Sequence, residues 1–348
     1  GFNTKFALRS SLGSAELTAR MKNGTNKQKA SYSANVNLNQ LNVGALTKQP
    51  QQLGSVTLST EISGTGLDPK TASLQFNGNI ASAYVKGYTY KNLSLKGTAV
   101  NGNYTTTASM KDPNINFSLN AKANMNKKYP SVNATLLVDS VNLKNLNLTT
   151  NETRFHGKIQ ANVPTANPDY LNANIKATDL VVFASGKRIK IDTVSLVSTA
   201  NADSSSLRLK TPMLYAHMAG KYKLTEIGAA MQDVFNQYFN RSIATKTVNA
   251  KPRYTPQQFK FDIRFTKTPL VTDFAPELKQ MDPITLNGWF NSGTGDLVVN
   301  GAMPKVRYAG GEISNVKLAI KTNQNELDYS LTADQIKPSS SINLLYTS

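Results

Sequence analysis

The chain has 348 residues, of which 39% are hydrophobic and 17% charged, and its formal net charge is +18 at pH 7. It contains no cysteine, which excludes a disulfide framework, a cysteine-ligated metal site and a cysteine nucleophile. Asn, Ser and Thr are abundant, and these residues suit solvated strand faces and turns better than helix interiors. We therefore expect an all-β protein.

Alternation of apolar and polar residues predicts β-strands along most of the chain, because successive side chains of a strand point to opposite faces. The longest case is INFSLNAKANM at 115–125, where six apolar residues alternate with five polar ones. Shorter alternating stretches predict strands at 74–80, 132–138, 171–177, 207–210, 259–265, 296–300 and 327–333. We expect them to form a meander of antiparallel neighbours.

Turn signals separate many of these stretches. Asn-Gly pairs occur at 77–78 and 101–102, and Asp stands beside Pro at 68–69, 112–113 and 282–283, as well as at 168–169 in the reverse order. These residue types tolerate the backbone conformations of tight turns. We read them as turns and not as catalytic groups.

Similar stretches recur along the chain. VNLNQLNV at 36–43 is similar to VNLKNLNL at 141–148. AYVKGYTYKNLSLKG at 83–97 is similar to VFASGKRIKIDTVSLVS at 182–198 and, more weakly, to RYAGGEISNVKLAI at 307–320. Internal repetition indicates an elongated architecture. We expect one β-groove segment over 1–348, with approximate repeats at 30–130, 131–224 and 255–336.

The segment 225–240 departs from strand alternation. Its apolar residues recur at helical spacing, which predicts an amphipathic helix insert, with Thr225 as the N-cap and Asn240 at the C-terminal end. The helix either covers an exposed apolar sheet or acts as a plug or partner-docking element in a groove. The spaced residues are Ile227, Met231, Val234, Phe235, Tyr238 and Phe239.

Groups suited to catalysis are sparse. The two histidines, His156 and His217, each stand alone in a strand-like context, without metal-ligand spacing to another His or a carboxylate. No GxSxG, Walker or HExxH motif occurs. We therefore expect no enzymatic activity, catalytic residue, metal site or cofactor. The positive charges are scattered singly, which argues against nucleic acid as a partner.

The predicted sheet has one long apolar face and a single helix to cover it. Ala fills many inward positions, as in NAKAN and NANIKA, whereas two sheets packed face to face need larger inward side chains. Either the sheet curls upon itself or another molecule fills it. A lipid acyl chain suits such a face, because each CH₂ removed from water contributes about 0.8 kcal/mol without needing a hydrogen bond. The candidate lining residues are Leu74, Phe76, Ile80, Ile115, Phe117, Leu119, Phe259, Phe261, Ile263 and Phe265.

Two functions of other classes compete with lipid binding. A chaperone or scaffold would offer its sheet edge to unfolded outer-membrane strands by β-augmentation. A purely architectural β-repeat, such as an adhesin stalk, would have a dry and fully packed interior.

The order of several stretches resembles the TamB/AsmA-like envelope proteins, especially the long forms of Bacteroidetes-type bacteria. The resemblance covers nearly the whole chain. It is carried by LNQLNVGAL at 38–46, LGSVTLSTEISGTGLDPKTASLQFNGNI at 53–80, GYTYKNLSLKG at 87–97, ATLLVDSVNLKNLNL at 134–148, KYKLTEIGAAMQDVFNQYF at 221–239 and the strands from FKFDIRF at 259–265 onward.

The resemblance implies a long curved antiparallel sheet folded lengthwise into an apolar groove, a β-taco, which crosses the periplasm from an inner-membrane anchor to the outer membrane. It implies phospholipid transport for outer-membrane lipid homeostasis and biogenesis, or work in a translocation and assembly module with an outer-membrane barrel partner. The chain has no apolar run of 18 residues that would span a membrane. We therefore expect an internal segment, whose membrane and barrel contacts lie in other regions of a longer protein.

Overall fold

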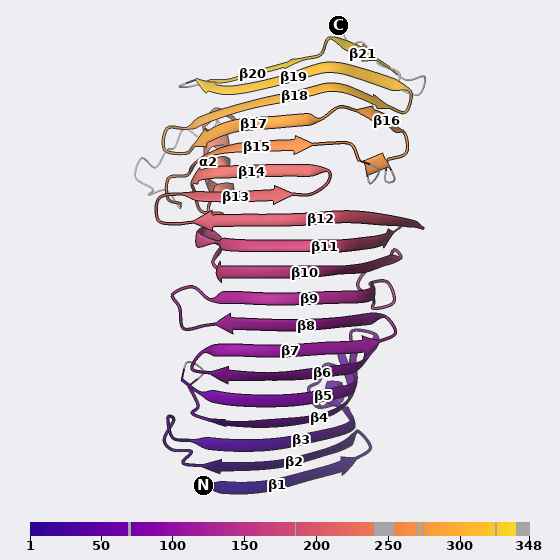
Figure 1. Ribbon diagram of the computed structural model, residues 1–348, viewed down its shortest axis with the longest axis vertical. Helices are drawn as coiled ribbons and strands as arrows, with labels where there is room; N and C mark the ends of the chain where they lie inside the picture. The colour runs from indigo at the N-terminus through magenta and orange to yellow at the C-terminus, as the bar shows by residue number, and fades with distance from the viewer. Residues whose placement is uncertain are drawn as a thin grey trace. The chain divides into compact units, whose positions relative to one another are not determined.

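The computed structural model describes residues 1–68, 71–184, 186–239, 254–268, 271–272, 275–323 and 326–338. The protein is nearly all β, with 68% strand and 7% helix. Its 21 strands within the described residues belong to one antiparallel sheet, which is not closed into a barrel (Figure 1). The predicted fold class, a long antiparallel sheet with one short helix, is confirmed.

Two compact units divide the chain. The N-terminal unit comprises Gly1–Thr165 and Ile175–Lys190, and the C-terminal unit comprises Ala166–Asn174 and Ile191–Ser348. Two strands, β11 (Asn172–Ala184) and β12 (Lys187–Ala200), contribute residues to both units.

In the N-terminal unit, β1 to β10 follow one another and each pairs antiparallel with the next (Figure 1). The one-turn helix α1 (Val43–Leu46) follows β3. The strands are β1 (Phe2–Ser10), β2 (Gly13–Lys22), β3 (Ser31–Asn42), β4 (Leu53–Thr65), β5 (Ser73–Val85), β6 (Tyr88–Val100), β7 (Asn103–Asp112), β8 (Ile115–Asn124), β9 (Ser131–Asn142) and β10 (Thr153–Thr165).

In the C-terminal unit, β12, β13, β14, β15, β17, β18 and β19 pair in that order, β16 pairs with β18, and β19 pairs with both β20 and β21. The unit begins with the 3₁₀ turn η1 (Pro168–Tyr170). Its other elements are β13 (Ser205–Lys210), β14 (Leu214–Lys221), α2 (Ile227–Phe239), β15 (Gln258–Phe265), β16 (Leu278–Met281), β17 (Ile284–Asn291), β18 (Asp296–Tyr308), β19 (Gly311–Asn323), β20 (Glu326–Thr332) and β21 (Gln335–Lys337).

Tight hairpins explain why consecutive strands pair. In the β6–β7 hairpin, Asn101 and Gly102 have φ of 48° and 69°, and the Ala309-Gly310 pair of the β18–β19 hairpin has φ of 48° and 82°. A two-residue loop with both φ positive matches the twist of the flanking strands, and glycine enters this region without steric cost. The predicted turn at 101–102 is confirmed.

The predicted turn at 77–78 is wrong. Asn77 and Gly78 lie inside β5, where Gly78 pairs with Thr60 of β4 and Leu95 of β6. Strands on both sides hydrogen-bond this part of β5, so the chain continues straight through the Asn-Gly pair. Asn77 is exposed and Gly78 half-buried, so the pair also fits the alternation of the strand.

The long alternating stretch at 115–125 forms β8, which ends one residue earlier than the pattern, at Asn124. Met125 lies beyond the strand and is 47% exposed. The helix predicted over 225–240 is α2, which spans Ile227–Phe239, while the predicted stop at Asn240 lies outside the described residues.

An ion-pair cluster links β18 and β19. Glu312 is 9% exposed and accepts hydrogen bonds from Arg307 and, at 3.1 Å, from Lys305. These two cations, Arg307 first, lower the pKa of the Glu312 carboxyl from its usual 4.5 to about 2. The folded state therefore prefers the ionised carboxylate.

The stabilisation from this cluster is expected to depend on pH. Because the folded pKa is depressed, the contribution is complete above pH 4.5 and is lost as the pH falls toward 2. Urea unfolding of Glu312→Gln and wild type should therefore differ at pH 7 and converge near pH 2. Glu326→Gln, on the exposed start of β20, is the control for loss of a surface carboxylate and should change stability by less than about 0.5 kcal/mol at pH 7. A constant difference across the pH range would contradict the assignment.

Candidate functional site

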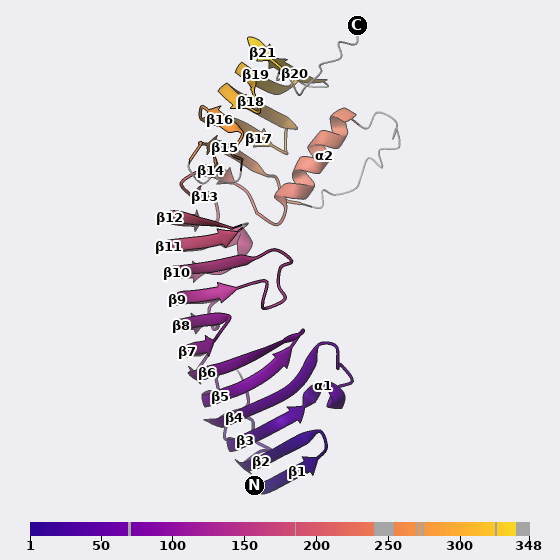
Figure 2. The ribbon, with the colours of Figure 1, turned by 90° about the vertical axis from the view of Figure 1, so that its right-hand side faces the viewer.

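Helix α2 packs against one face of the sheet in the C-terminal unit (Figure 2). Ala230 and Val234 of the helix are 0% and 1% exposed. They belong to a cluster with Phe259, Phe290 and Leu297 near the ends of their strands. The centroids of the Phe259 and Phe290 rings lie 5.2 Å apart. This cluster seats one side of the helix on the sheet.

Beside this cluster, the same apolar stripe of α2 borders a cavity of about 560 Å³ above the same face of the sheet. Ile227, Met231 and Phe235 of the helix form one wall. Residues of β12 to β15 and β17 to β19 form the floor, and His217 is the only polar residue among the 17 described residues that line the cavity. The cavity can therefore hold an apolar ligand but offers few hydrogen-bonding groups.

Strand register explains the apolar floor, because directly paired residues share a face. One row across the strands runs through Leu209, Ala216, Ile263 and Leu286. The neighbouring row runs through Leu207, Met218, Phe261, Gly288, Val299 and Ile320. Most of these residues are only half-buried, so the face remains accessible from solvent.

Glycine residues let aromatic rings lie flat across this face. Phe261 pairs with Gly288, and a Cβ atom at Gly288 would come within 2.5 Å of Cζ of that ring. In the N-terminal unit, Phe76 pairs with Gly97, where a Cβ atom would come within 2.4 Å of Cζ of Phe76. Each ring occupies the space of a missing side chain on the next strand. The Phe76 and Phe261 rings consequently lie over the neighbouring strand and project less from the apolar face.

A buried polar network holds the start of α2. The Gln257 side chain is 0% exposed, and its Oε1 accepts from the backbone N–H of Lys223 at 2.7 Å. Its Nε2 donates to Thr255 O at 2.6 Å and to Glu226 Oε2 at 3.2 Å. The residues before the helix are therefore tied to the residues before β15.

Glu226 completes this network. Its carboxylate accepts from the backbone N–H and the hydroxyl of Thr255 at 2.6 and 2.7 Å, and it pairs with Lys223 at 3.0 Å. Burial alone raises the pKa of this carboxyl, but the hydrogen bonds from Thr255 and Lys223 outweigh burial and leave the pKa lowered. Glu226 is therefore ionised at neutral pH.

The sequence assigned the N-cap to Thr225, and the structure differs. The hydroxyl of Thr225 donates to the carboxylate of Asp169 at 2.9 to 3.0 Å, and its backbone N–H donates to the same carboxylate at 3.0 Å. The first turn instead begins with bonds from Glu226 N–H and Ile227 N–H to the carbonyl of Lys223. A distant carboxylate on η1 thus competes successfully for the Thr225 side chain.

Four predicted lining residues lie on β15. Phe259, Phe261 and Ile263 line the cavity, whereas Phe265 shares their face of β15 but is not among the lining residues. Phe259 is largely taken up by the cluster under α2, since it is 4% exposed.

The other six predicted residues lie in the N-terminal unit and share one face there. Ile80, Leu93, Met110, Phe117 and Val138 form a continuous row across β5 to β9. All six predicted residues are half-buried, as expected of a face without a packed second layer. The set is Leu74, Phe76, Ile80, Ile115, Phe117 and Leu119.

Some lining residues were not named from the sequence. Leu286 and Phe290 of β17 lie on the cavity face, but Gly288 between them hides the apolar period. The sequence predicted that Ile227, Met231 and Phe235 share the apolar face of a helix, but it did not show which strands that face contacts. The sequence does contain a pattern for β17, because Ile284, Leu286, Gly288 and Phe290 alternate with other residues if glycine is allowed on the apolar face.

Comparison of the chain with protein families, with curated proteins and with solved structures finds no match. Among the described residues, no helix is both long and apolar enough to cross a membrane. The cavity and the sheet face that forms it are therefore the features of the molecule that bear on function.

Proposed function

We propose that this chain is a non-catalytic lipid carrier that holds the acyl chains of phospholipid against the apolar face of its sheet. The observation that carries the proposal is the cavity of about 560 Å³ under α2, with its apolar lining. Ligand pockets typically have volumes of about 300 to 1,000 Å³. This one offers a long apolar ligand a wall, a floor and few polar partners.

An acyl chain fits this surface for energetic reasons. Each CH₂ group removed from water contributes about 0.8 kcal/mol, and a saturated chain has no polar group to satisfy. The apolar rows run across the strands, so a chain lying along them can shift from one strand to the next without breaking a hydrogen bond. The net charge of +18 favours anionic head groups nearby.

The cellular role in this proposal comes from the resemblance to TamB/AsmA-like envelope proteins. On that basis the chain is a periplasmic segment of an inner-membrane-anchored protein that carries phospholipid between the inner and outer membranes. Contacts with an outer-membrane barrel partner and with the membranes belong to regions outside this chain.

A carboxylate placed in the cavity should expel the lipid. Phe261→Glu is expected to reduce phospholipid co-purification about tenfold, because an unpaired charge in an apolar site costs more than the 1.4 kcal/mol that corresponds to one decade. Native mass spectrometry of gently purified protein measures the bound lipid. Leu209→Glu, on the neighbouring row, provides a second test that leaves the Phe261–Gly288 pair intact.

Matched controls lie on the opposite face of the same strands. Lys260→Glu and Arg208→Glu introduce the same carboxylate at exposed positions next to Phe261 and Leu209. These controls should retain lipid, and circular dichroism should show equal strand content in all four variants. Equal lipid loading in the cavity variants and wild type would refute the proposal.

A second candidate function, a chaperone that acts by β-augmentation, is favoured by the sheet edges. Within the described residues, β1 pairs only with β2 and β20 only with β19. Phe6 on β1 is 53% exposed, and Tyr329 on β20 is 79% exposed. Under this function, proline in β20 would abolish cross-linking to unfolded outer-membrane strands but leave lipid binding unchanged.

A further inference from the structure

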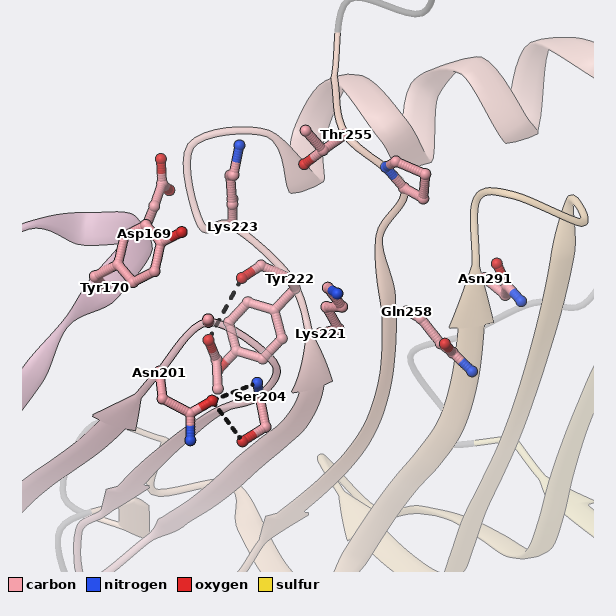
Figure 3. A pocket seen from close by; sticks show the side chains of 13 residues that line it. Asp169, Tyr170, Asn201, Ser204, Lys221, Tyr222, Lys223, Thr255, Gln258 and Asn291 are labelled. Carbon is pink, nitrogen blue, oxygen red and sulfur yellow. Dashed lines mark hydrogen bonds between the residues drawn. The ribbon is translucent and has the colours of Figure 1, made fainter.

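A second cavity, of about 350 Å³, lies in the C-terminal unit at the ends of β14, β15 and β17 (Figure 3). Its lining combines the end of β14 with η1 and with the turn between β12 and β13. It shares no lining residue with the apolar cavity under α2. It is therefore a separate site, the strand-end pocket.

Strand register places part of the strand-end pocket on the face opposite the apolar cavity. Lys221 pairs with Gln258, and Gln258 pairs with Asn291. The neighbouring row of paired residues, Gly220, Phe259 and Phe290, faces α2. Because successive side chains of a strand alternate between faces, the side chains of Lys221, Gln258 and Asn291 point to the opposite face. Figure 3 shows Asp169 and Tyr170 on the side of the pocket away from Gln258 and Asn291.

Three acceptor side chains of the strand-end pocket already accept hydrogen bonds within the protein. Asn201 Oδ1 accepts from the backbone N–H groups of Asp203 and Ser204 at 2.8 and 2.9 Å, and Asn291 Oδ1 accepts from Gly293 N–H at 2.9 Å. The Asp169 carboxylate accepts from Thr225. These bonds leave the amide NH₂ groups of Asn201 and Asn291 as the uncommitted ends of their side chains.

The cations of the strand-end pocket are less committed. Lys223 pairs with Glu226 at 3.0 Å, which occupies one of its three N–H donors. Lys221 is exposed and has no ion-pair partner among the described residues. The available groups thus include two ammonium ions and the side-chain amides of Asn201, Asn291 and Gln258. Two cations in one pocket suit an anion with several oxygens better than a neutral sugar.

We propose that the strand-end pocket binds a phosphate ester through Lys221, Lys223 and the amide groups of Asn201 and Asn291. The phosphate belongs either to a soluble ester or to the head group of a phospholipid. The site does not depend on the apolar cavity, because the two cavities share no lining residue. It therefore goes beyond the proposed lipid carriage.

Isothermal titration calorimetry with sn-glycerol 3-phosphate tests the site in the full chain, with glycerol as the uncharged comparison. The ester should bind and glycerol should not. Lys221→Gln should weaken binding at least about tenfold, because it removes a charge-assisted hydrogen bond. Lys210→Gln is the matched control, since Lys210 is an exposed lysine at the far end of β13 and does not line the pocket.

Titration with dihexanoyl phosphatidylglycerol distinguishes the two sources of phosphate. A soluble ester is the source if glycerol 3-phosphate binds at least as tightly as the short-chain lipid. A lipid head group is the source if the short-chain lipid binds more tightly than the ester and Lys221→Gln weakens it. Absence of binding by both probes, or equal weakening by Lys221→Gln and Lys210→Gln, would overturn the site. Loss of lipid co-purification in Phe261→Glu bears only on the apolar cavity.

Discussion

Replacing Gln257 with leucine is expected to lower the free energy of unfolding of the C-terminal unit by about 3 kcal/mol. The leucine fills nearly the same volume but cannot accept from Lys223 N–H or donate to Thr255 and Glu226. A buried polar group left without a partner costs about 1 to 3 kcal/mol. This change leaves both the Lys223 N–H and the Thr255 carbonyl without their Gln257 partner. Since Gln257 joins the segment before α2 to the segment before β15, the helix should also lose its fixed position.

Trp289 offers a direct measurement of this effect. It is the only tryptophan of the chain and lies in β17, so its fluorescence during urea unfolding reports on the C-terminal unit. Gln258→Leu is the control at the next position, where the side chain is exposed, and it should change stability by less than about 0.5 kcal/mol. Similar stability losses in the two variants would contradict the network described for Gln257.

Gly288→Ala is expected to destabilise the C-terminal unit by about 2 to 3 kcal/mol and to disturb the apolar cavity. The new Cβ atom would lie 2.2 Å from the carbonyl oxygen of Val298 and 2.5 Å from Cζ of Phe261. The first neighbour is backbone and cannot move without shifting β18, so the strain cannot be relieved by a side-chain rotation alone. The Phe261 ring should be forced away from the sheet and into the cavity.

A glycine-to-alanine substitution at an uncrowded position serves as the control, because it shows the effect of alanine without a steric clash. A Cβ atom at Gly228, in the first turn of α2, has no neighbouring atom within 4 Å. Gly228→Ala should stabilise the protein by roughly 0.5 to 1 kcal/mol, because alanine has the higher helix propensity. Thermal unfolding and lipid co-purification of both variants provide the measurement. Gly288→Ala with wild-type stability would show that β17 and β18 are not packed as described.

Local chemistry was sufficient to predict several elements of this protein. Alternation identified β8 and β15, and helical spacing identified α2, because both periods arise within one element and need no information about neighbours. The turn at Asn101 and Gly102 followed in the same way from residues that accept positive φ. The Asn-Gly pair at 77–78 misled the prediction because only its strand neighbours decide whether such a pair bends.

The site depended on relations that no local pattern contains. Phe259, Phe261 and Ile263 were predicted as lining, but the sequence did not show that α2 stands over them or that Phe261 rests on Gly288. Likewise, Asp169 accepts a hydrogen bond from the hydroxyl of Thr225, 56 residues away in the sequence, and Gln257 accepts one from the backbone N–H of Lys223, 34 residues away. The residue pattern of a strand determines which side chains share a face, whereas only the pairing of distant strands and the seating of the helix decide what that face encloses.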